Sequence, residues 1–159
     1  MIDKFNTAVQ ITLGHEGGYD DNPNDTGGET NFGITQADMP GQDMKLLTVQ
    51  QAVAYYAEHY WKSLFGQISD QDVLNKLFDM GVLFGVGEAA YLLQRALNFL
   101  PDKWTKTFDD DTLTATNAAV AVDLLKRYKS HLQAHAMNLA NANPNDRVFL
   151  SGWLKRIQS

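Results

Sequence analysis

The fold is decided by GHEGGYDDNPNDTGGETNFGIT, residues 14–35. The preceding residues, 3–15, have the apolar periodicity of a helix, and Gly17-Gly18 ends that helix. The rest of the stretch is rich in Gly, Asn and Asp, which is typical of loops and hairpins, and Thr26-Gly27-Gly28 predicts a tight turn. We therefore expect a helix that ends beside a small β-hairpin, with Glu16 at the junction.

Outside this stretch the sequence predicts helices. Thr48 and Gln51 have the spacing of a capping box, so a helix is expected to begin there. Further helices are expected over residues 70–80, 88–99, 114–141 and 146–157, with a polar loop over 100–112. The predicted class is α+β and mainly helical, with helices around a core and a small β-hairpin beside the active cleft.

Composition limits the class of protein. The chain has 159 residues, which fits one domain, and its hydrophobic content of 44% is enough for a packed core. Acidic residues outnumber basic ones 19 to 13, the opposite of the balance in nucleic-acid-binding proteins. Residues 1–45 hold eight acids and two bases and so carry the whole formal net charge of -6. No nucleic-acid partner is expected.

The sequence also limits the chemistry and the location. There is no cysteine, which excludes disulfides, thiol nucleophiles and cysteine metal sites. No apolar run approaches the roughly 20 residues that span a bilayer, so no stable membrane insertion is expected. The N-terminus lacks the basic start and continuous apolar segment of a signal peptide. We therefore expect a cytoplasmic protein that needs another component to reach a substrate outside the inner membrane.

Glu16 and Asp25 form a pair of carboxyl groups that suits cleavage of a glycosidic bond. A carboxyl at a helix C-terminus is expected to keep its proton, because burial and the negative end of the helix dipole both disfavour its charged form. A carboxylate on a solvent-facing hairpin stays ionised and can stabilise positive charge on the sugar or steer water. The hydroxyl of Thr30 is expected to orient that water.

Other interpretations of these residues stay open on spacing alone. An acid near a helix end with an Asp-rich loop behind it is common and often has no catalytic role. A calcium loop is a second alternative, although Pro23 interrupts the alternation that such a loop requires. His131 and His135 have zinc-ligand spacing, but Leu132 stands where the usual motif has glutamate. We expect neither a metal nor an organic cofactor.

Aromatic residues crowd the helix YYAEHYW, residues 55–61. Sugar rings stack on aromatic faces, whereas most aromatic side chains in proteins fill the core. We expect two of these four aromatic residues to lie in the core. Tyr60 is the best candidate for a sugar-binding groove.

Residues 14–35 resemble the signature of glycoside hydrolase family 108, which is close to E-G-G-Y followed by D-P-x-D-x-G-G-x-T-x-x-G-I-T. The matching residues are Glu16, Gly17, Gly18, Tyr19, Pro23, Asp25, Gly27, Gly28, Thr30, Gly33, Ile34 and Thr35. Asn22 stands where many relatives have Asp. The spacing from Glu16 to Asp25 also resembles that of the phage lysozymes of glycoside hydrolase family 24, in which the threonine follows one residue later.

The resemblance implies a lysozyme-like fold and an N-acetylmuramidase. Such an enzyme hydrolyses the β-1,4 bond between N-acetylmuramic acid and N-acetylglucosamine in bacterial peptidoglycan. Glu16 would be the catalytic acid, with Asp25 and Thr30 as its catalytic partners. The expected substrate-binding residues are Tyr19, Asn31, Gln36 and Tyr60.

The second half of the chain also resembles the family. Residues 79–99 are similar to the start of its predicted peptidoglycan-binding segment, and FLSGWLKRI, residues 149–157, is similar to the end. Residues 109–116, DDDTLTAT, depart from the usual D-G-x-x-G-x-x-T. We expect one lysozyme-like domain over residues 1–159, with a catalytic half, 1–81, and a helical half, 82–159, that serves mainly as a scaffold.

The resemblance further implies a monomeric endolysin that, if phage-encoded, waits in the host cytoplasm until a holin-type pore admits it to the wall. Two alternatives are a lytic transglycosylase and a non-catalytic peptidoglycan-binding or secretion-assisting protein. The combination of Glu16, Asp25 and Thr30 argues against the latter, because binding alone needs no proton donor. The last helix, with Arg147, Lys155 and Arg156 expected in solvent, is interpreted as a structural clamp rather than a membrane-disrupting segment.

Overall fold

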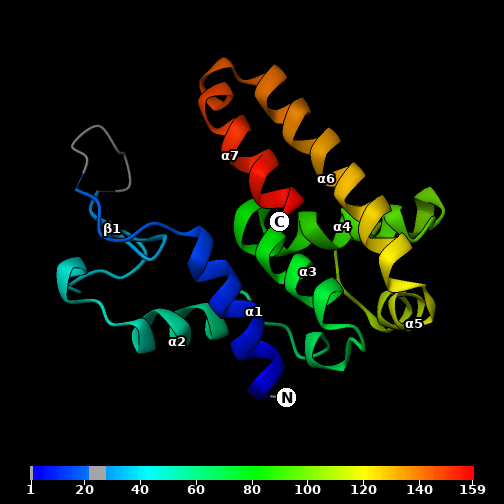
Figure 1. Cartoon of the computed structure of the whole chain (residues 1–159), viewed down its shortest axis with the longest axis horizontal. Helices are drawn as coiled ribbons and strands as arrows, with labels where there is room; N and C mark the ends of the chain where they lie inside the picture. Colours follow the sequence, from blue (N-terminus) through cyan, green and yellow to red (C-terminus); the bar gives the residue numbers. More distant parts are fainter. Residues whose placement is uncertain (1, 22–27) are drawn as a thin grey trace. The chain divides into compact units, whose positions relative to one another are not determined.

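The computed structural model describes residues 2–21 and 28–159, with side chains from residue 4 onward. These residues form seven α-helices, four 3-10 helices and a two-stranded antiparallel sheet (Figure 1). The predicted α+β, mainly helical class is therefore confirmed. None of the helices in this part of the chain is both long and apolar enough to cross a membrane.

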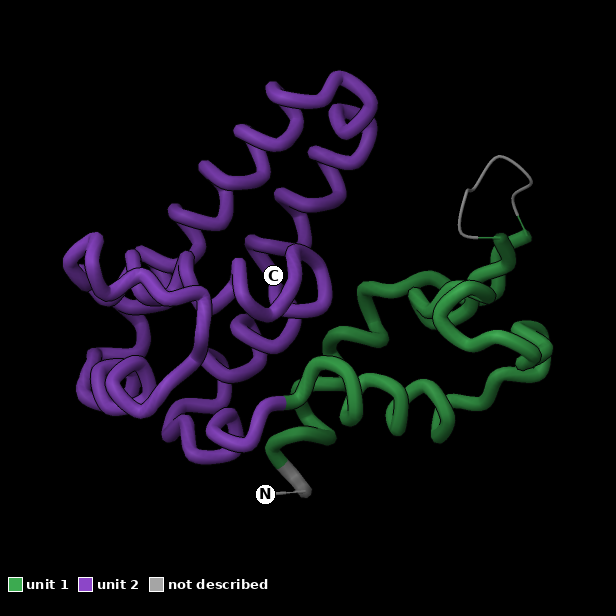
Figure 2. The backbone as a smooth tube through the Cα atoms, turned by 180° about the vertical axis from the view of Figure 1, so that it is seen from behind, with its two compact units in different colours: residues 1–61 green, residues 62–159 purple. Residues whose placement is uncertain are grey.

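The chain divides into two compact units, Met1–Trp61 and Lys62–Ser159 (Figure 2). We call them unit 1 and unit 2. The boundary between them precedes helix α3, whereas the halves expected from the sequence meet at residue 81. The expected functional division of the chain stays a proposal.

Unit 1 joins two helices through a hairpin and a short 3-10 turn. Its elements are α1 (Ile2–His15), β1 (Thr30–Asn31), β2 (Ile34–Thr35), η1 (Met44–Leu46) and α2 (Val49–His59). Helix α1 buries Ala8, Val9 and Thr12 on one side. Its end at His15 agrees with the prediction from Gly17-Gly18.

The hairpin turns at Phe32 and Gly33. Thr30 pairs with Thr35 and Asn31 with Ile34, so only two residues connect the strands. Both have positive φ, 52° and 74°, as the common two-residue hairpin turn requires. The Tyr56 hydroxyl donates to the Phe32 carbonyl oxygen (2.8 Å) and ties the turn to α2.

The sequence predicted the hairpin but not the residues of this turn. The tight turn was expected at Thr26-Gly27-Gly28, of which Thr26 and Gly27 lie outside the described residues. The capping box of α2 is confirmed. The Thr48 hydroxyl accepts from the Gln51 backbone N–H (3.2 Å), and the Thr48 backbone N–H donates to the Gln51 side chain (2.9 Å).

Unit 2 is a helical assembly around α3. Its elements are η2 (Phe65–Gln67), α3 (Gln71–Phe84), α4 (Val86–Ala96), η3 (Pro101–Lys103), α5 (Asp110–Ala118), α6 (Ala121–Ala142), η4 (Pro144–Asp146) and α7 (Arg147–Gln158). Residues 73–81 of α3 are all buried, because α3 packs against α4 and α6. Asp70 caps α3 by accepting from the N–H groups of Asp72 and Val73, both at 3.0 Å.

One predicted loop and one predicted helix of unit 2 are wrong. Asp109 caps α5 by accepting from the Thr112 N–H (2.9 Å) and hydroxyl (2.6 Å), so the expected loop over 100–112 ends inside a helix. The single helix expected over 114–141 is interrupted at Ala119 and Val120, which have extended backbone. Neither residue is glycine or proline, so the sequence carries no usual signal for the break.

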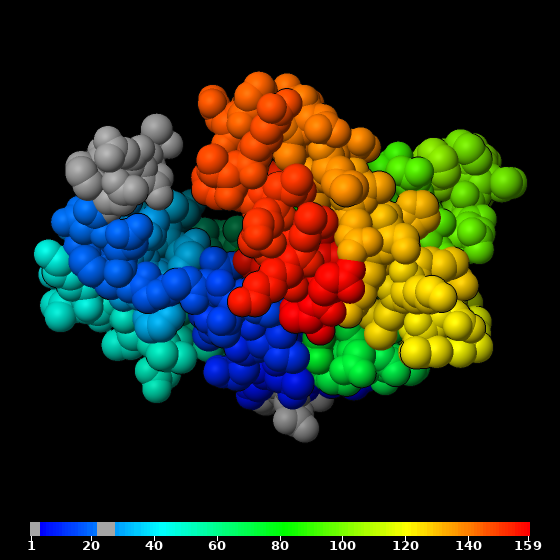
Figure 3. All heavy atoms as spheres, turned by 45° about the horizontal axis from the view of Figure 1, so that its top comes forward, coloured from blue at the N-terminus to red at the C-terminus, as the bar shows by residue number. Residues whose placement is uncertain are grey.

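Helix α7 lies alongside α6 (Figure 3). Asp146 precedes it as predicted, but its side chain makes no capping hydrogen bond. Arg156 was expected in solvent, and this expectation is wrong because its guanidinium binds the buried Asp79 carboxylate (2.8 Å). The buried Ile157 anchors the same end, whereas Phe149 is 57% exposed.

Candidate active site

Glu16 lies directly after the last residue of α1. Its N–H donates to the Thr12 carbonyl oxygen (3.1 Å), which extends the helical hydrogen bonding by one residue. The half-buried side chain lies against the hairpin turn. A Cβ built on Gly33 would lie 2.7 Å from the Glu16 Cδ and 2.9 Å from its Cγ, so any larger residue there would force the Glu16 carboxyl group to move.

Two features therefore favour glycine at position 33. Its φ of 74° belongs to the left-handed region that side chains disfavour, and its missing Cβ leaves the space that the Glu16 carboxyl occupies. The matched turn of the sequence signature thus shapes the surroundings of the glutamate. The contact links two features that are 17 residues apart in the sequence.

Tyr60 directly follows the last residue of α2, and its hydroxyl senses the charge of Glu16. Burial raises the pKa of its hydroxyl, and the negative charges of Asp38 and Glu16 raise it further. Its ring lies 5.6 Å from that of Tyr56 and 6.4 Å from that of Tyr55, centroid to centroid. Among the four expected substrate-binding residues, Tyr60 is the one whose pKa is raised by the charge of Glu16.

Asp38 is a second carboxyl in this region, and the sequence analysis missed it. Its Oδ2 accepts from the Thr35 hydroxyl (2.7 Å) and the Thr35 N–H (3.1 Å), which fixes it just after β2. Burial and the Asp38 charge together raise the pKa of Tyr55 to about 12. The spacing Thr35-x-x-Asp38 is typical of a local hydrogen-bonding turn, and this was the signal in the sequence that could have identified Asp38.

Two of the expected site residues, Asn31 and Thr30, make hydrogen bonds that hold the hairpin in place. The amide of Asn31 is buried and donates to the Met44 carbonyl oxygen (2.8 Å), so it joins β1 to η1. Thr30 is half-buried, and its backbone exchanges two hydrogen bonds of 2.9 Å with Asp20. Both residues position the turn that contacts Glu16.

The remaining expected site residues are Tyr19, Gln36 and Asp25. Tyr19 is exposed, and the Lys45 ammonium lies 5.3 Å from the centre of its ring. The Gln36 amide donates to the Met39 carbonyl oxygen (3.2 Å). Asp25, the expected second catalytic carboxylate, lies outside the described residues.

The aromatic helix places its rings in different surroundings. Tyr56 is buried, and Trp61 is half-buried with its ring 5.0 Å from that of Phe5. Tyr55 lies on the outer side of α2 beside His59, with ring centroids 4.2 Å apart.

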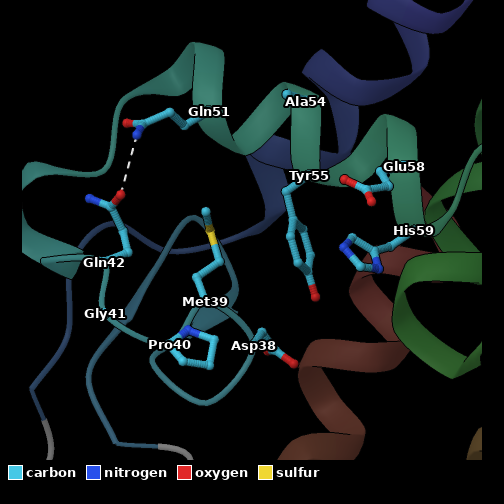
Figure 4. A pocket seen from close by; sticks show the side chains of 10 residues that line it. All are labelled: Asp38, Met39, Pro40, Gly41, Gln42, Gln51, Ala54, Tyr55, Glu58 and His59. Atoms are coloured by element: carbon cyan, nitrogen blue, oxygen red, sulfur yellow. Dashed lines mark hydrogen bonds between the residues drawn. The ribbon is translucent and has the colours of Figure 1, made fainter.

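A pocket of about 570 Å³ lies between α2 and residues 38–42 (Figure 4). Tyr55 and His59 point into it from the helix, and Asp38, Met39 and Pro40 face them from the loop. The side chains of Gln42 and Gln51 close one end through a hydrogen bond of 3.3 Å. The pocket belongs entirely to unit 1.

His131 and His135 lie on α6 in unit 2. Burial lowers the pKa of each, and the His135 Nδ1 is 3.6 Å from a carboxylate oxygen of Glu88. Across residues 2–21 and 28–159, no group of three or more His, Asp or Glu is placed to hold a metal ion.

The family model described as Glycosyl hydrolase 108 matches residues 9–85. Residues 9–85 belong to the glycosyl hydrolase 108 family. The family segment contains Glu16, the hairpin, α2 and the whole of α3. The predictions of this family and of a glycoside hydrolase are therefore confirmed.

A solved structure resembles this chain over nearly its whole length. The structure of Brucella abortus SagA is similar to this chain with a TM-score of 0.77 and 25% sequence identity, over 99% of this chain and 91% of that chain. Comparison with curated proteins found no match. The family match and this neighbour confirm the predicted lysozyme-like fold and support a peptidoglycan-hydrolysing, muramidase-type glycosyl hydrolase 108.

Proposed function

We propose that Glu16 is the proton donor with which this enzyme hydrolyses the β-1,4 bond between N-acetylmuramic acid and N-acetylglucosamine. The observation that carries this proposal is the seating of the Glu16 side chain against Gly33 inside the matched family segment. General acid catalysis requires a carboxyl held within hydrogen-bonding reach of the leaving oxygen. The contact of the Glu16 carboxyl with a helix end and a tight turn restricts its position, which supports this role.

The remaining catalytic roles follow from the chemistry of glycoside cleavage. As the bond from the sugar carbon to the leaving oxygen breaks, Glu16 gives its proton to that oxygen and positive charge develops on the sugar. We assign Asp25 to stabilise that charge or to steer the attacking water, and Thr30 to orient the water. Thr30 lies on β1, three residues before Gly33, which supports a role on the same side of the turn.

Substrate binding is assigned to Tyr60 first. Its raised pKa keeps the hydroxyl protonated at neutral pH, so it can donate a hydrogen bond to a sugar oxygen. Tyr19 and Gln36 are proposed as outer contacts because they lie on the segments that flank the hairpin. Asn31 is proposed to act indirectly, through its hydrogen bond to Met44.

Analysis of the products tests the reaction. Purified sacculi are digested in water enriched in oxygen-18, and the soluble products are identified by mass spectrometry. Hydrolysis gives reducing muramic acid ends that carry one heavy oxygen for each cleaved bond. Unlabelled 1,6-anhydro ends would contradict the proposal in favour of a lytic transglycosylase, and intact sacculi would contradict it in favour of a wall-binding protein.

We also propose that the enzyme acts as a monomeric endolysin. Its bacteriolytic role would then depend on a holin-type pore that gives it access to the wall from the cytoplasm. Expression in a bacterial host with and without a co-expressed holin tests this. Lysis only in the presence of the holin is expected, and rapid lysis without it would contradict the proposed dependence.

A further inference from the structure

The pocket between α2 and residues 38–42 has no part in the proposed proton transfer. Its volume of about 570 Å³ lies within the range of roughly 300–1,000 Å³ that is usual for ligand sites. It combines an aromatic wall with several polar groups (Figure 4). This combination is what a site for a partly apolar, hydroxyl-rich ligand needs.

The aromatic wall consists of Tyr55 and His59. Their ring centroids are 4.2 Å apart and their planes differ by 34°, so each ring restrains the other. Both project from α2 toward the loop (Figure 4). A pyranose ring has a face of C–H bonds that stacks on such a surface, as other apolar faces do.

The polar groups supply both donors and acceptors. Asp38 is held by its two hydrogen bonds from Thr35 and presents a carboxylate at the pocket edge. The amides of Gln42 and Gln51 are oriented by their mutual hydrogen bond, by the bond from Gln42 to the Asp43 carbonyl oxygen (2.9 Å) and by the bonds from Thr48 to the Gln51 oxygen (both 2.9 Å). Hydroxyl and acetamido groups of an N-acetylated sugar require this mixture of partners.

The charges of the pocket indicate a neutral ligand. The lining contains the carboxylates of Asp38 and Glu58 and neither lysine nor arginine. An anionic group would be repelled by this lining, because like charges brought together at an interface are unfavourable. N-Acetylglucosamine carries no charge and avoids that cost.

The pocket also lies close to the proposed catalytic acid. Tyr55 lines the pocket, and its ring is 6.4 Å from that of Tyr60. The Tyr60 hydroxyl in turn lies within the electrostatic influence of both Glu16 and Asp38. Tyr60 thus lies between the ring of Tyr55, which lines the pocket, and a position at which it senses the charge of Glu16.

We propose that this pocket binds a neutral N-acetylated sugar ring of the glycan strand, outside the bond that Glu16 cleaves. Tyr55 provides the stacking surface, and Asp38, Gln42 and Gln51 bind the polar substituents. The inference rests on the proposed function for the identity of the strand. It adds a specificity site that joins Tyr55 and His59, from the aromatic segment noted in the sequence, with Asp38, Gln42 and Gln51, which no sequence motif indicated.

Binding can be measured separately from catalysis. The full-length Glu16→Gln protein is titrated with tri-N-acetylchitotriose and followed by amide NMR shifts. Shifts concentrated in residues 38–42 and 51–59 are expected. Tyr55→Ala should weaken binding roughly three- to tenfold, the size of one lost aromatic contact, and Tyr55→Phe should retain it.

A matched control is Tyr91→Ala, which removes a half-buried tyrosine from α4 in unit 2. It should leave the affinity unchanged. If Tyr55→Ala does not fold, Asp38→Asn serves instead, since its side chain is exposed, and it should weaken binding about threefold. Unchanged affinity in a folded Tyr55→Ala or Asp38→Asn protein, or shifts confined to other residues, would overturn the proposal.

Kinetics and a second probe complete the test. On sacculi, Tyr55→Ala in the active enzyme should raise KM severalfold with little change in kcat. A stem peptide with a free amino group is the competing probe. Tight binding of that peptide, abolished by Glu58→Gln and absent for the sugar trimer, would assign the pocket to a peptide ammonium instead.

The two proposals fail in different ways. Oxygen-18 incorporation without trimer binding would leave the muramidase proposal standing and remove the pocket assignment. Trimer binding at these residues without any cleavage of sacculi would do the reverse.

Discussion

Units 1 and 2 use their charged side chains in opposite ways. In unit 1 Asp38 and Glu58 are exposed, and Glu16 is half-buried at the end of α1. In unit 2 the Asp79 carboxylate is 1% exposed and bound by Arg156. The difference supports the proposal that unit 1 carries the chemistry, whereas the buried charges of unit 2 serve stability.

Hydrogen bonds link the buried ion pair of unit 2 to the end of α7. The Arg156 guanidinium makes three hydrogen bonds of 2.8–3.2 Å to Asp79. The Lys76 ammonium donates to the Arg156 carbonyl oxygen (2.8 Å), and Lys129 donates to that of Gln158 (2.7 Å). The two lysines thereby satisfy carbonyl groups that the end of α7 leaves without helical partners.

The largest effect is expected from Glu16→Gln. The substitution keeps the shape of the side chain and removes the proton that it donates. Activity on sacculi should fall by roughly 10²–10⁴-fold, the usual contribution of general acid catalysis, while the melting temperature barely changes. Turbidity clearing at low enzyme concentration measures the loss.

Glu88→Gln is the matched control in unit 2. Glu88 forms a surface ion pair with Lys106 (2.8 Å), and such pairs contribute little to stability. Activity should stay near the parent value. Equal losses in both variants would contradict the assignment of the chemistry to unit 1.

Asp79→Ala should give the largest loss of stability. It leaves the Arg156 guanidinium buried without its partner, and breaking a buried ion pair in this way costs about 3–5 kcal/mol. Urea unfolding measures the loss. The activity of each folded molecule should not change below the melting transition.

The control is Asp123→Ala, an exposed acid in the first turn of α6. It should cost less than about 1 kcal/mol, the value of a surface charge near a helix N-terminus. If Asp79→Ala costs no more than this control, the network is not what anchors α7.

Local sequence signals account for much of the fold. The capping residues Thr48 and Asp70 fixed two helix starts, because their hydrogen bonds depend on residues only two or three positions away. The break at Ala119 and Val120 has no such local cause. Arg156 was expected in solvent but binds Asp79, a residue 77 positions away, and no periodicity in the sequence reveals such a distant partner.

The candidate site shows the same limit. The signature located Glu16 and Gly33 in the sequence, but their contact appears only when the turn folds back onto the end of α1. Phe32 with positive φ is unusual for a bulky residue, so the turn was expected elsewhere. Asp38 and Tyr55 both line the pocket, but the sequence marked only Tyr55, as part of the aromatic segment 55–61, and did not pair it with Asp38.

Gly33→Ala should impair the enzyme without removing any catalytic group. The new Cβ would displace the Glu16 carboxyl, and a misplacement of about 1 Å can cost roughly 100-fold in rate. The left-handed backbone adds a stability cost of about 1–2 kcal/mol. Both quantities can be measured on the same preparation.

Gly28→Ala separates the two effects. Gly28 also has left-handed backbone, with φ of 73°, but a Cβ there meets only the Gln36 Cβ at an ordinary 3.7 Å. It should lose similar stability and far less activity. If the two variants lose activity equally, general strain in unit 1, rather than the contact with Glu16, is responsible.

The smallest effect concerns Lys76 and depends on pH. Its side chain is 7% exposed, and burial lowers its pKa to about 8, although the Asp79 charge opposes the shift. The ordinary pKa of a lysine side chain, which applies to the unfolded chain, is 10.5. Burying the charged ammonium therefore costs free energy, and this cost is present in full below pH 8.

Between pH 8 and 10.5 the unfolded chain binds more protons at Lys76 than the folded chain does, so this residue makes stability rise with pH. Lys76→Met removes that rise. The free energy of unfolding of the variant relative to the parent should therefore fall by about 1–2 kcal/mol from pH 7 to pH 9.5. Groups common to both proteins cancel in this difference, including Tyr128, whose pKa burial raises well above its usual value. Lys155→Met, at an exposed position of α7, should show no such trend. If the difference in free energy of unfolding between Lys76→Met and the parent is the same at pH 7 and pH 9.5, Lys76 titrates as an exposed lysine does. Lys76 would then no longer distinguish unit 2 from unit 1 as a buried cation.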